Sequence, residues 1–183
     1  MAFGVVLDTS VLYPLSIADV LMRLAERELY DLYWSESILQ ELARVMQEKG
    51  ASREQAEHRV AAMRGAFESA MVSPEAIAQL MPAMTNDDGD RHVLAAAVAC
   101  GADAVITANL RHFPPESCEP HGIDAIHPDD FLVTLFDLDP ATVQRAVIDQ
   151  AAALHRPATS RDDLIGMLEK AGASKFARRL RGQ

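Results

Sequence analysis

The chain has 183 residues, of which 49% are hydrophobic and 24% are charged. Those values are typical of one medium globular domain with a full core and room for a short addition, and they exclude a disordered or fibrous chain. No apolar run approaches the ~20 residues of a membrane helix, and Asp8 interrupts the apolar N-terminus where a signal peptide would continue. We therefore expect a cytoplasmic protein.

The formal net charge of −10 argues against a general electrostatic footprint for nucleic acid. That objection weakens if some of the carboxylates serve to hold cations. The basic residues are also uneven, since no acid follows Glu169 and five bases do: Lys170, Lys175, Arg178, Arg179 and Arg181. This basic end is either a solvated helix face or a contact surface for RNA or a partner. The second interpretation assigns contacts to Lys175, Arg178, Arg179 and Arg181.

Short apolar runs alternate with amphipathic segments in the first half of the chain. Residues 4–7 are a continuous apolar run in front of Asp8, as expected for a central parallel strand covered on both faces. Residues 32–34 are a plausible second strand. Helices are predicted where apolar residues recur at helical spacing, the first opened by a capping pair of Ser16 with Asp19. The alternation predicts an α/β protein.

Residues 86–113 combine an acidic loop, a helix, a strand and a polar turn. Three aspartates crowd the loop, and the last, Asp90, stands where a helix would begin. Apolar residues then recur at helical spacing until Gly101, which supplies a C-terminal stop. A short buried strand ends at Thr107. Polar groups at a helix start and at a strand end face one crevice in an open α/β sheet, where ligands usually bind.

A last strand is predicted at residues 122–126, followed by a helix that starts at Pro128. From Asp139 onward the pattern is helical only. We therefore expect an α/β domain in residues 1–136, built as a parallel sheet between helices. Residues 137–183 are expected to form a C-terminal helical appendage.

Acidic residues from separate segments are candidates to meet at the carboxyl edge of this sheet. They are Asp8, Glu41, Asp87 and Asp90, with Asn109 as a neutral neighbour. Carboxylates that are packed together repel one another unless a cation or protons neutralise them. Oxygen-rich sites of this kind suit Mg²⁺ or Mn²⁺. Two such ions ~4 Å apart can stabilise the attacking and leaving oxygens of a phosphoryl displacement.

Each acid taken alone also has a plainer interpretation. Asp8 suits turn or cap chemistry, Asp90 suits a helix N-cap worth about 1 kcal/mol, and Glu41 suits a solvated helix position. The six histidines lack the HExxH spacing and are interpreted as structural or exposed. The ordered combination of acids, rather than any one of them, predicts a site.

Three blocks of the sequence, VVLDTSVL, LQELARV and DDGDRHVLAAAVACGADAVITANLRHF, resemble PIN-domain ribonucleases of the VapC type. These are the toxin halves of bacterial toxin–antitoxin pairs. The resemblance covers residues 3–136 and is most specific in the last block. It implies a PIN-like parallel sheet sandwiched by helices and RNA cleavage with Mg²⁺ or Mn²⁺ held by acids. It also implies a cognate antitoxin protein as partner, while a homodimer is left open.

The resemblance also implies residue roles. Asp8, Glu41 and Asp90 would be the catalytic, metal-binding acids, and Asp87 would be an additional metal-binding acid on the loop before the helix. The supporting groups that position these acids would be Ser10 and Thr107.

The chain departs from the family pattern at two positions where an aspartate is common, Asn109 and His112. An asparagine can offer a carbonyl oxygen or orient a water, but it adds no charge. The number of metal ions, one or two, is therefore open. Two functions follow as hypotheses: a metal-dependent endoribonuclease toxin, or a PIN-like module that binds RNA or a partner with lost or reduced turnover. The sequence does not specify which RNA is cut.

Overall fold

A four-stranded parallel sheet forms the centre of the computed structural model, which describes residues 3–155 and 158–182. The strand order is β2-β1-β3-β4, and each neighbouring pair is parallel. The strands are β1 (Gly4–Leu7), β2 (Asp31–Tyr33), β3 (Ala104–Ile106) and β4 (Asp124–Ile126). Both central strands, β1 and β3, are buried along their whole length, as continuous apolar runs require.

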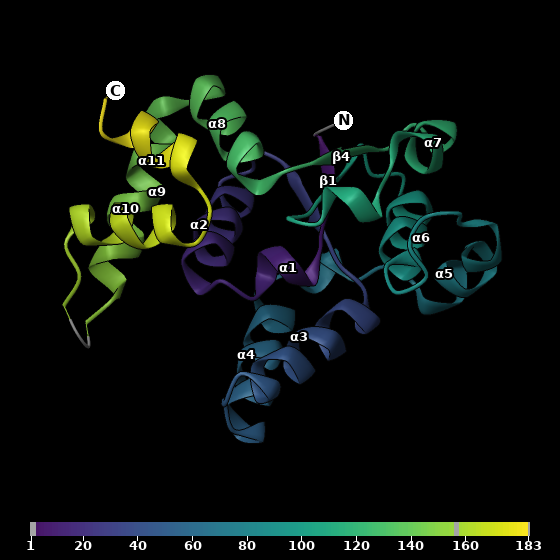
Figure 1. The fold of residues 1–183 in the computed structure, drawn as a ribbon. Helices are drawn as coiled ribbons and strands as arrows, with labels where there is room; N and C mark the ends of the chain where they lie inside the picture. The colour runs from purple at the N-terminus through teal and green to yellow at the C-terminus, as the bar shows by residue number, and fades with distance from the viewer. Residues whose placement is uncertain (1–2, 156–157, 183) are drawn as a thin grey trace.

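Helices connect and cover the strands, so the predicted α/β class is confirmed (Figure 1). The α-helices of the described residues are α1 (Thr9–Leu12), α2 (Leu15–Glu26), α3 (Glu36–Glu48), α4 (Arg53–Ala66), α5 (Pro74–Leu80), α6 (Arg91–Cys100), α7 (Pro115–Cys118), α8 (Pro128–Leu138), α9 (Pro140–Ala153), α10 (Arg161–Lys170) and α11 (Ser174–Leu180). In Figure 1, α2 and α8–α11 lie on one side of β1 and α5–α7 lie on the other. The α3–α4 hairpin projects below the sheet.

Local signals in the sequence predicted some helix boundaries and missed others. Gly101 ends α6 in the left-handed conformation (φ 66°), which glycine adopts without a Cβ clash. The predicted capping pair of Ser16 with Asp19 is wrong. The helix begins two residues earlier than a Ser16 cap would place it, with Pro14 as the N-cap, whose φ of −65° already suits the turn into a helix. Ser16 is consequently buried inside the first turn, and Asp19 forms an ion pair within the helix.

The strand order creates a crevice between β1 and β3. In the order β2-β1-β3-β4, the chain passes from β1 to β2 toward one edge of the sheet and from β3 to β4 toward the opposite edge. Asp8 directly follows β1, and its N–H donates to the Ile106 carbonyl at 3.1 Å. Thr107 directly follows β3, and its N–H donates to the Ile126 carbonyl at 3.0 Å. The ladder thus continues past both strand ends and fixes these two residues at the mouth of the crevice.

The C-terminal helices pack against the α/β part of the chain, α9 on α2 and α11 on α8. Phe176 and Val147 are fully buried and belong to the same hydrophobic cluster as the sheet residues. A buried polar contact joins the two parts, because the Gln150 side chain donates to the Ser16 carbonyl at 3.0 Å. The division at residue 136 remains a prediction.

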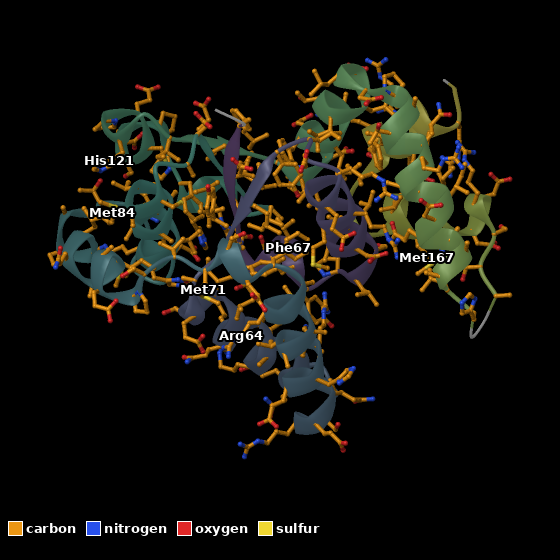
Figure 2. All side chains as sticks on the ribbon, turned by 180° about the vertical axis from the view of Figure 1, so that it is seen from behind. Arg64, Phe67, Met71, Met84, His121 and Met167 are labelled. Atoms are coloured by element: carbon orange, nitrogen blue, oxygen red, sulfur yellow. The ribbon has the colours of Figure 1, made fainter. Side chains whose placement is uncertain are left out.

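Figure 2 shows the opposite face, with Met84 and His121 on one side of the molecule and Met167 of α10 on the other. Arg64 and Phe67 mark the end of the α3–α4 hairpin that joins the body. Within the part of the chain that the structure describes, no helix combines enough length and apolarity to cross a membrane.

A buried carboxylate fastens the last helix. Asp129 of α8 is 3% exposed, and its two oxygens accept the backbone N–H groups of Lys175 at 2.9 Å and Phe176 at 2.8 Å. These are amides of the first turn of α11, which the helix itself leaves unpaired.

We expect Asp129→Ala to lower the free energy of unfolding by about 2–3 kcal/mol, because two buried amides lose a charged acceptor. The melting temperature should fall by about 5–10 °C for a domain of this length. The matched control is Asp130→Ala, which removes only an exposed ion pair with Lys175 and should cost under about 1 kcal/mol. Thermal unfolding followed by circular dichroism would contradict this account if both variants melted alike.

Candidate active site

A buried aspartate lies at the crevice between β1 and β3. Asp8 is 2% exposed, and its Oδ2 accepts hydrogen bonds from the hydroxyls of Ser10 at 2.6 Å and Thr107 at 2.8 Å. Each hydroxyl in turn accepts a backbone N–H at 3.0 Å, from Ala108 to Ser10 and from Asn109 to Thr107. A hydroxyl has one proton, so these incoming amides leave that proton for Asp8. The carboxylate is therefore fixed through one oxygen.

Asp8 and Asp90 both occupy N-cap positions, before α1 and α6 respectively, but neither side chain caps its helix. The plainer interpretation of each acid as a cap is therefore wrong. Hydrogen bonds to groups elsewhere in the fold turn both carboxylates away from the capping position. Among the described residues, no hydrogen bond reaches Oδ1 of either acid.

Two further side chains that could bind a metal ion lie close to Asp90. Candidate ligand atoms of Asp87, Asp90 and His112 lie within 4.8 Å of one another. The shortest contact joins Asp90 Oδ2 to His112 Nδ1 at 2.6 Å. Asp87 is exposed, and its Oδ1 accepts the Gly89 N–H at 3.1 Å, which closes the acidic loop into a tight turn.

The charge state of Asp90 reflects its surroundings. Burial raises the pKa of this carboxyl above its ordinary value of 3.8. The hydrogen bond from His112 lowers the pKa, whereas the negative charges of Asp8 and Asp87 raise it. Asp8 and Asp87 thus each lie near enough to Asp90 for their negative charge to disfavour its ionised form.

Glu41 of α3 is held beside Asp8 by the residue that follows Asp8 in the chain. The Thr9 hydroxyl lies 3.0 Å from Glu41 Oε2, and His92 Nε2 of α6 lies 3.7 Å from the same oxygen. On the outer side, an Arg44 guanidinium nitrogen lies 3.6 Å from Glu41 Oε1. Glu41 is thus engaged with the site region rather than freely solvated, contrary to its plainer interpretation.

The remaining predicted residues lie farther from this chemistry or play minor parts in it. Asp88, which was not predicted as a site residue, is exposed and forms an ion pair with Arg91 at 2.6 Å. Asn109 donates its backbone N–H to the Thr107 hydroxyl, which is the part it plays in fixing Asp8. At the basic end Arg178 is exposed, and three ion pairs join this end to α8 and α10: Lys175–Asp130, Arg179–Asp137 and Arg181–Glu169.

His112 and His92 lie in the site region, whereas the sequence pattern only disfavoured the histidines as zinc ligands and gave them no part in the site. The HExxH test detects only ligands on one helical face, whereas these two histidines come from different elements. The available signal was positional, since His112 stands where the family pattern commonly has an acid. The three-dimensional structure, rather than any residue spacing in the sequence, places these two histidines in the site region.

The donor set fits a divalent cation of the Mg²⁺ or Mn²⁺ class. Oxygen atoms dominate it, the carboxylate charges repel one another, and Oδ1 of both Asp8 and Asp90 is left without a hydrogen bond within the described ranges. A bound cation would remove the repulsion and satisfy these oxygens. The residues present therefore suit the ion that the resemblance implies.

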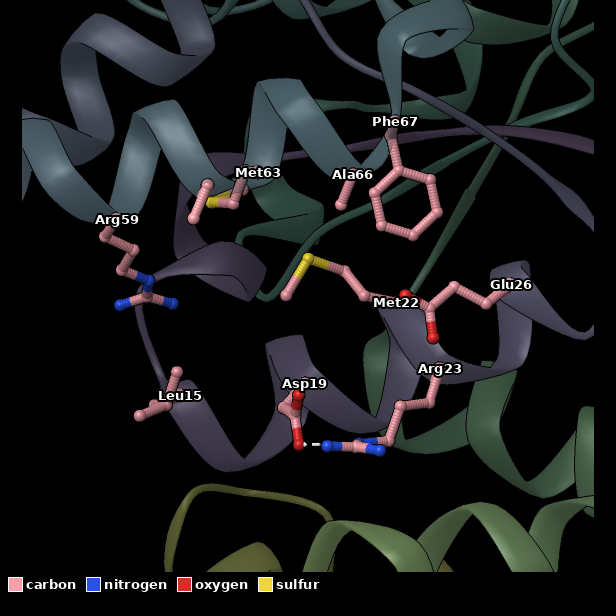
Figure 3. A pocket seen from close by; sticks show the side chains of 10 residues that line it. Leu15, Asp19, Met22, Arg23, Glu26, Arg59, Met63, Ala66 and Phe67 are labelled. Atoms are coloured by element: carbon pink, nitrogen blue, oxygen red, sulfur yellow. Dashed lines mark hydrogen bonds and ion pairs between the residues drawn. The ribbon is translucent and has the colours of Figure 1, made fainter. Parts of the chain in front are cut away.

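A separate groove of about 310 Å³ lies between α2 and α4 (Figure 3). Arg59, Met63 and Phe67 line it from the α4 side, and Leu15 and Asp19 line it from α2. None of the predicted site residues borders this groove. The groove is therefore separate from the acidic cluster.

Comparison with known families agrees with the fold. The PIN domain family matches residues 4–111, more than half of the chain, and the VapC50 C-terminal domain matches residues 128–182. The chain belongs to the PIN domain family.

One curated relative gives a finer comparison. Over 89 residues the chain is 39% identical to the protein named "Putative ribonuclease VapC50" of Mycobacterium tuberculosis. The aligned region is 49% of this chain and 53% of that protein, so the chain spans about half the length of the relative. No solved structure matches the chain.

The metal-free protein should show a pH-dependent gain in stability on Asp90→Asn. Because the folded-state pKa of Asp90 is raised, its contribution to stability is fully present below pH 3.8 and is lost as pH rises through the folded value. Asparagine escapes this loss and still offers an oxygen to His112. We expect a melting temperature up to about 2–4 °C above wild type at neutral pH, with the difference shrinking toward pH 4.

The same melting experiment with Mn²⁺ provides the control. The ion should stabilise wild type more than Asp90→Asn and so reverse their order. A variant that melts at or below wild type at pH 7 without metal would sink the repulsion argument.

Proposed function

We propose that this protein is a metal-dependent endoribonuclease, the toxin of a toxin–antitoxin pair, which acts in the cytoplasm on RNA phosphodiester bonds. The single observation that carries the proposal is the grouping of Asp87 and Asp90 with His112, close enough to Asp8 at the end of β1 for the charge of Asp8 to act on Asp90. The name of the curated relative, a ribonuclease, supports the reaction class. The partners would be an RNA substrate and a cognate antitoxin protein.

In this proposal Asp8, Glu41 and Asp90 are the catalytic acids, and together with Asp87 they would hold Mg²⁺ or Mn²⁺. When bound, the ion would supply positive charge at the phosphate oxygens and make a water more acidic. The carboxylates would orient an RNA phosphate indirectly, since their own charge repels it.

Ser10 and Thr107 would serve the acids by fixing Asp8. Their hydroxyls bind only Oδ2, and their protons have no other acceptor at comparable distance among the described residues except each other, at 3.4 Å. Oδ1 of Asp8 would then be presented to the crevice without a change of side-chain conformation. Such preorganisation spares the site a reordering step when the ion and substrate bind.

Asn109 bears on the number of ions. A neutral amide cannot supply the negative charge that would hold a second divalent ion. We therefore propose one firm metal position near Asp90 and at most a weak second one, to which Asp87 would contribute.

The alternative is a PIN-like module that binds RNA or a partner with little turnover. The neutral Asn109 favours it. It differs from the first proposal in one measurable respect, because it predicts no RNA cleavage with Mn²⁺.

Purified wild type should cleave RNA in Mn²⁺ and stop in EDTA, and Asp8→Asn should lower the rate by at least about 100-fold because one metal-binding charge is removed. The matched control is Asp88→Asn, which removes an exposed neighbouring acid that pairs with Arg91 and should leave the rate unchanged. The products, resolved on a denaturing gel, are the readout. Cleavage that persists in EDTA, or wild type that cuts no RNA, would refute the nuclease.

The C-terminal helices, residues 137–183, are proposed as an appendage that contributes substrate or partner contacts.

A variant without these basic side chains tests the proposal, with neutral residues at Lys175, Arg178, Arg179 and Arg181. The slope of log RNA affinity against log salt concentration should become less steep by about 0.7 for each phosphate contact that is lost. The measurement uses the Asp8→Asn background, so that RNA stays intact. Lys49→Gln with Arg53→Gln on the α3–α4 hairpin is the control for loss of charge alone. An unchanged slope would show that the four residues touch no phosphate.

A further inference from the structure

His112 makes two hydrogen bonds through its ring, and together they identify its tautomer. Arg111 Nε lies 3.2 Å from His112 Nε2, and an arginine nitrogen can only donate. His112 Nε2 is therefore an unprotonated acceptor, and the ring proton lies on Nδ1. That proton points at Asp90 Oδ2, 2.6 Å from the nitrogen that carries it. The pair is a neutral imidazole that donates to a carboxylate.

The main chain of His112 also holds the acidic loop. Its carbonyl accepts the Asp87 N–H at 3.3 Å, and the Asp87 carbonyl accepts the Asp90 N–H at 2.9 Å. The loop from Asp87 to Asp90 is thus attached to His112 at both ends, by backbone at one and by side chain at the other. His112 is partly buried, with 27% of its side chain exposed.

We infer that His112 is a positioning residue for the metal site: it binds Oδ2 of Asp90 through Nδ1–H and so leaves Oδ1 to face the ion. The inference rests on the proposed function and deepens it. Carboxylates that bind metals commonly depend on such hydrogen-bonded partners, whose removal weakens binding by about 10–100-fold.

Direct coordination by His112 is disfavoured by the same geometry. A ring nitrogen binds a metal through its lone pair, but Nδ1 carries the proton, and Nε2 accepts from Arg111. An aspartate at position 112, as the family resemblance suggests, would instead add a third carboxylate beside Asp87 and Asp90. The imidazole replaces that repulsion with a donor.

The test measures Mn²⁺ binding to the full chain by electron paramagnetic resonance, with no RNA present. His112→Ala removes the donor and should raise the Mn²⁺ dissociation constant by about tenfold or more. His112→Asn places an amide N–H near the position of Nδ1–H and should stay within about threefold of wild type. Arg111→Ala removes the group that fixes the tautomer and should weaken binding to an intermediate degree.

Pulsed resonance on the wild-type Mn²⁺ complex separates positioning from ligation. The inference predicts no directly bonded nitrogen on Mn²⁺, and a strong ¹⁴N coupling would overturn it. Equal affinity of His112→Ala and wild type would also overturn it while leaving the nuclease proposal intact if RNA is still cut. Wild type that neither binds Mn²⁺ nor cleaves RNA would refute the proposed function and, with it, this role. Melting temperatures of the variants establish that each one is folded.

Discussion

The hydrogen bond between the Thr107 hydroxyl and the Asp8 carboxylate is the contact on which the site depends. It joins the ends of two adjacent parallel strands at 2.8 Å, and the flanking ladder bonds prevent either end from moving independently. Because β1 and β3 are buried throughout, their positions are set by the core rather than by any ligand. A carboxylate that would otherwise be solvated is thereby held in a partly dehydrated crevice. The rest of the site, α6 with its acidic loop and α3 with Glu41, is arranged around this point.

The site combines charge repulsion with local fixation. Negative charges that repel one another cost stability in the free protein, yet each carboxylate is fixed by neutral donors on one oxygen only. Hydroxyls serve Asp8 and an imidazole serves Asp90. Neutral donors restrain the acids without cancelling the charge that a cation would need. Among the described residues, Arg44 approaches Glu41 from its outer side and Arg91 pairs with the exposed Asp88, whereas no arginine pairs with Asp8 or Asp90.

The sequence predicted the α/β class and the parallel strands, because each depends on a local pattern, whereas the acids were chosen by their order along the chain and remain a prediction. Buried strands appear in the sequence as apolar runs. Gly101 indicates a helix end because the last turn closes with a left-handed residue, a conformation that suits glycine. The roles of His112 and of Ser16 were not predictable in this way. His112 meets Asp90 across 22 residues of chain, and Ser16 contacts Gln150 across 134. Such contacts are set by the packing of whole elements, and no spacing rule encodes them.

The central claim is that the acids at the β1–β3 crevice form a divalent-cation site. A crystal grown with Mn²⁺ and measured at a wavelength sensitive to manganese tests it most directly, since the anomalous signal locates the ion without reference to activity. The account predicts one strong peak within coordination distance of Oδ1 of Asp8 and of Asp90, with His112 still bonded to Asp90 Oδ2. A crystal that binds Mn²⁺ only elsewhere, or not at all, would contradict it.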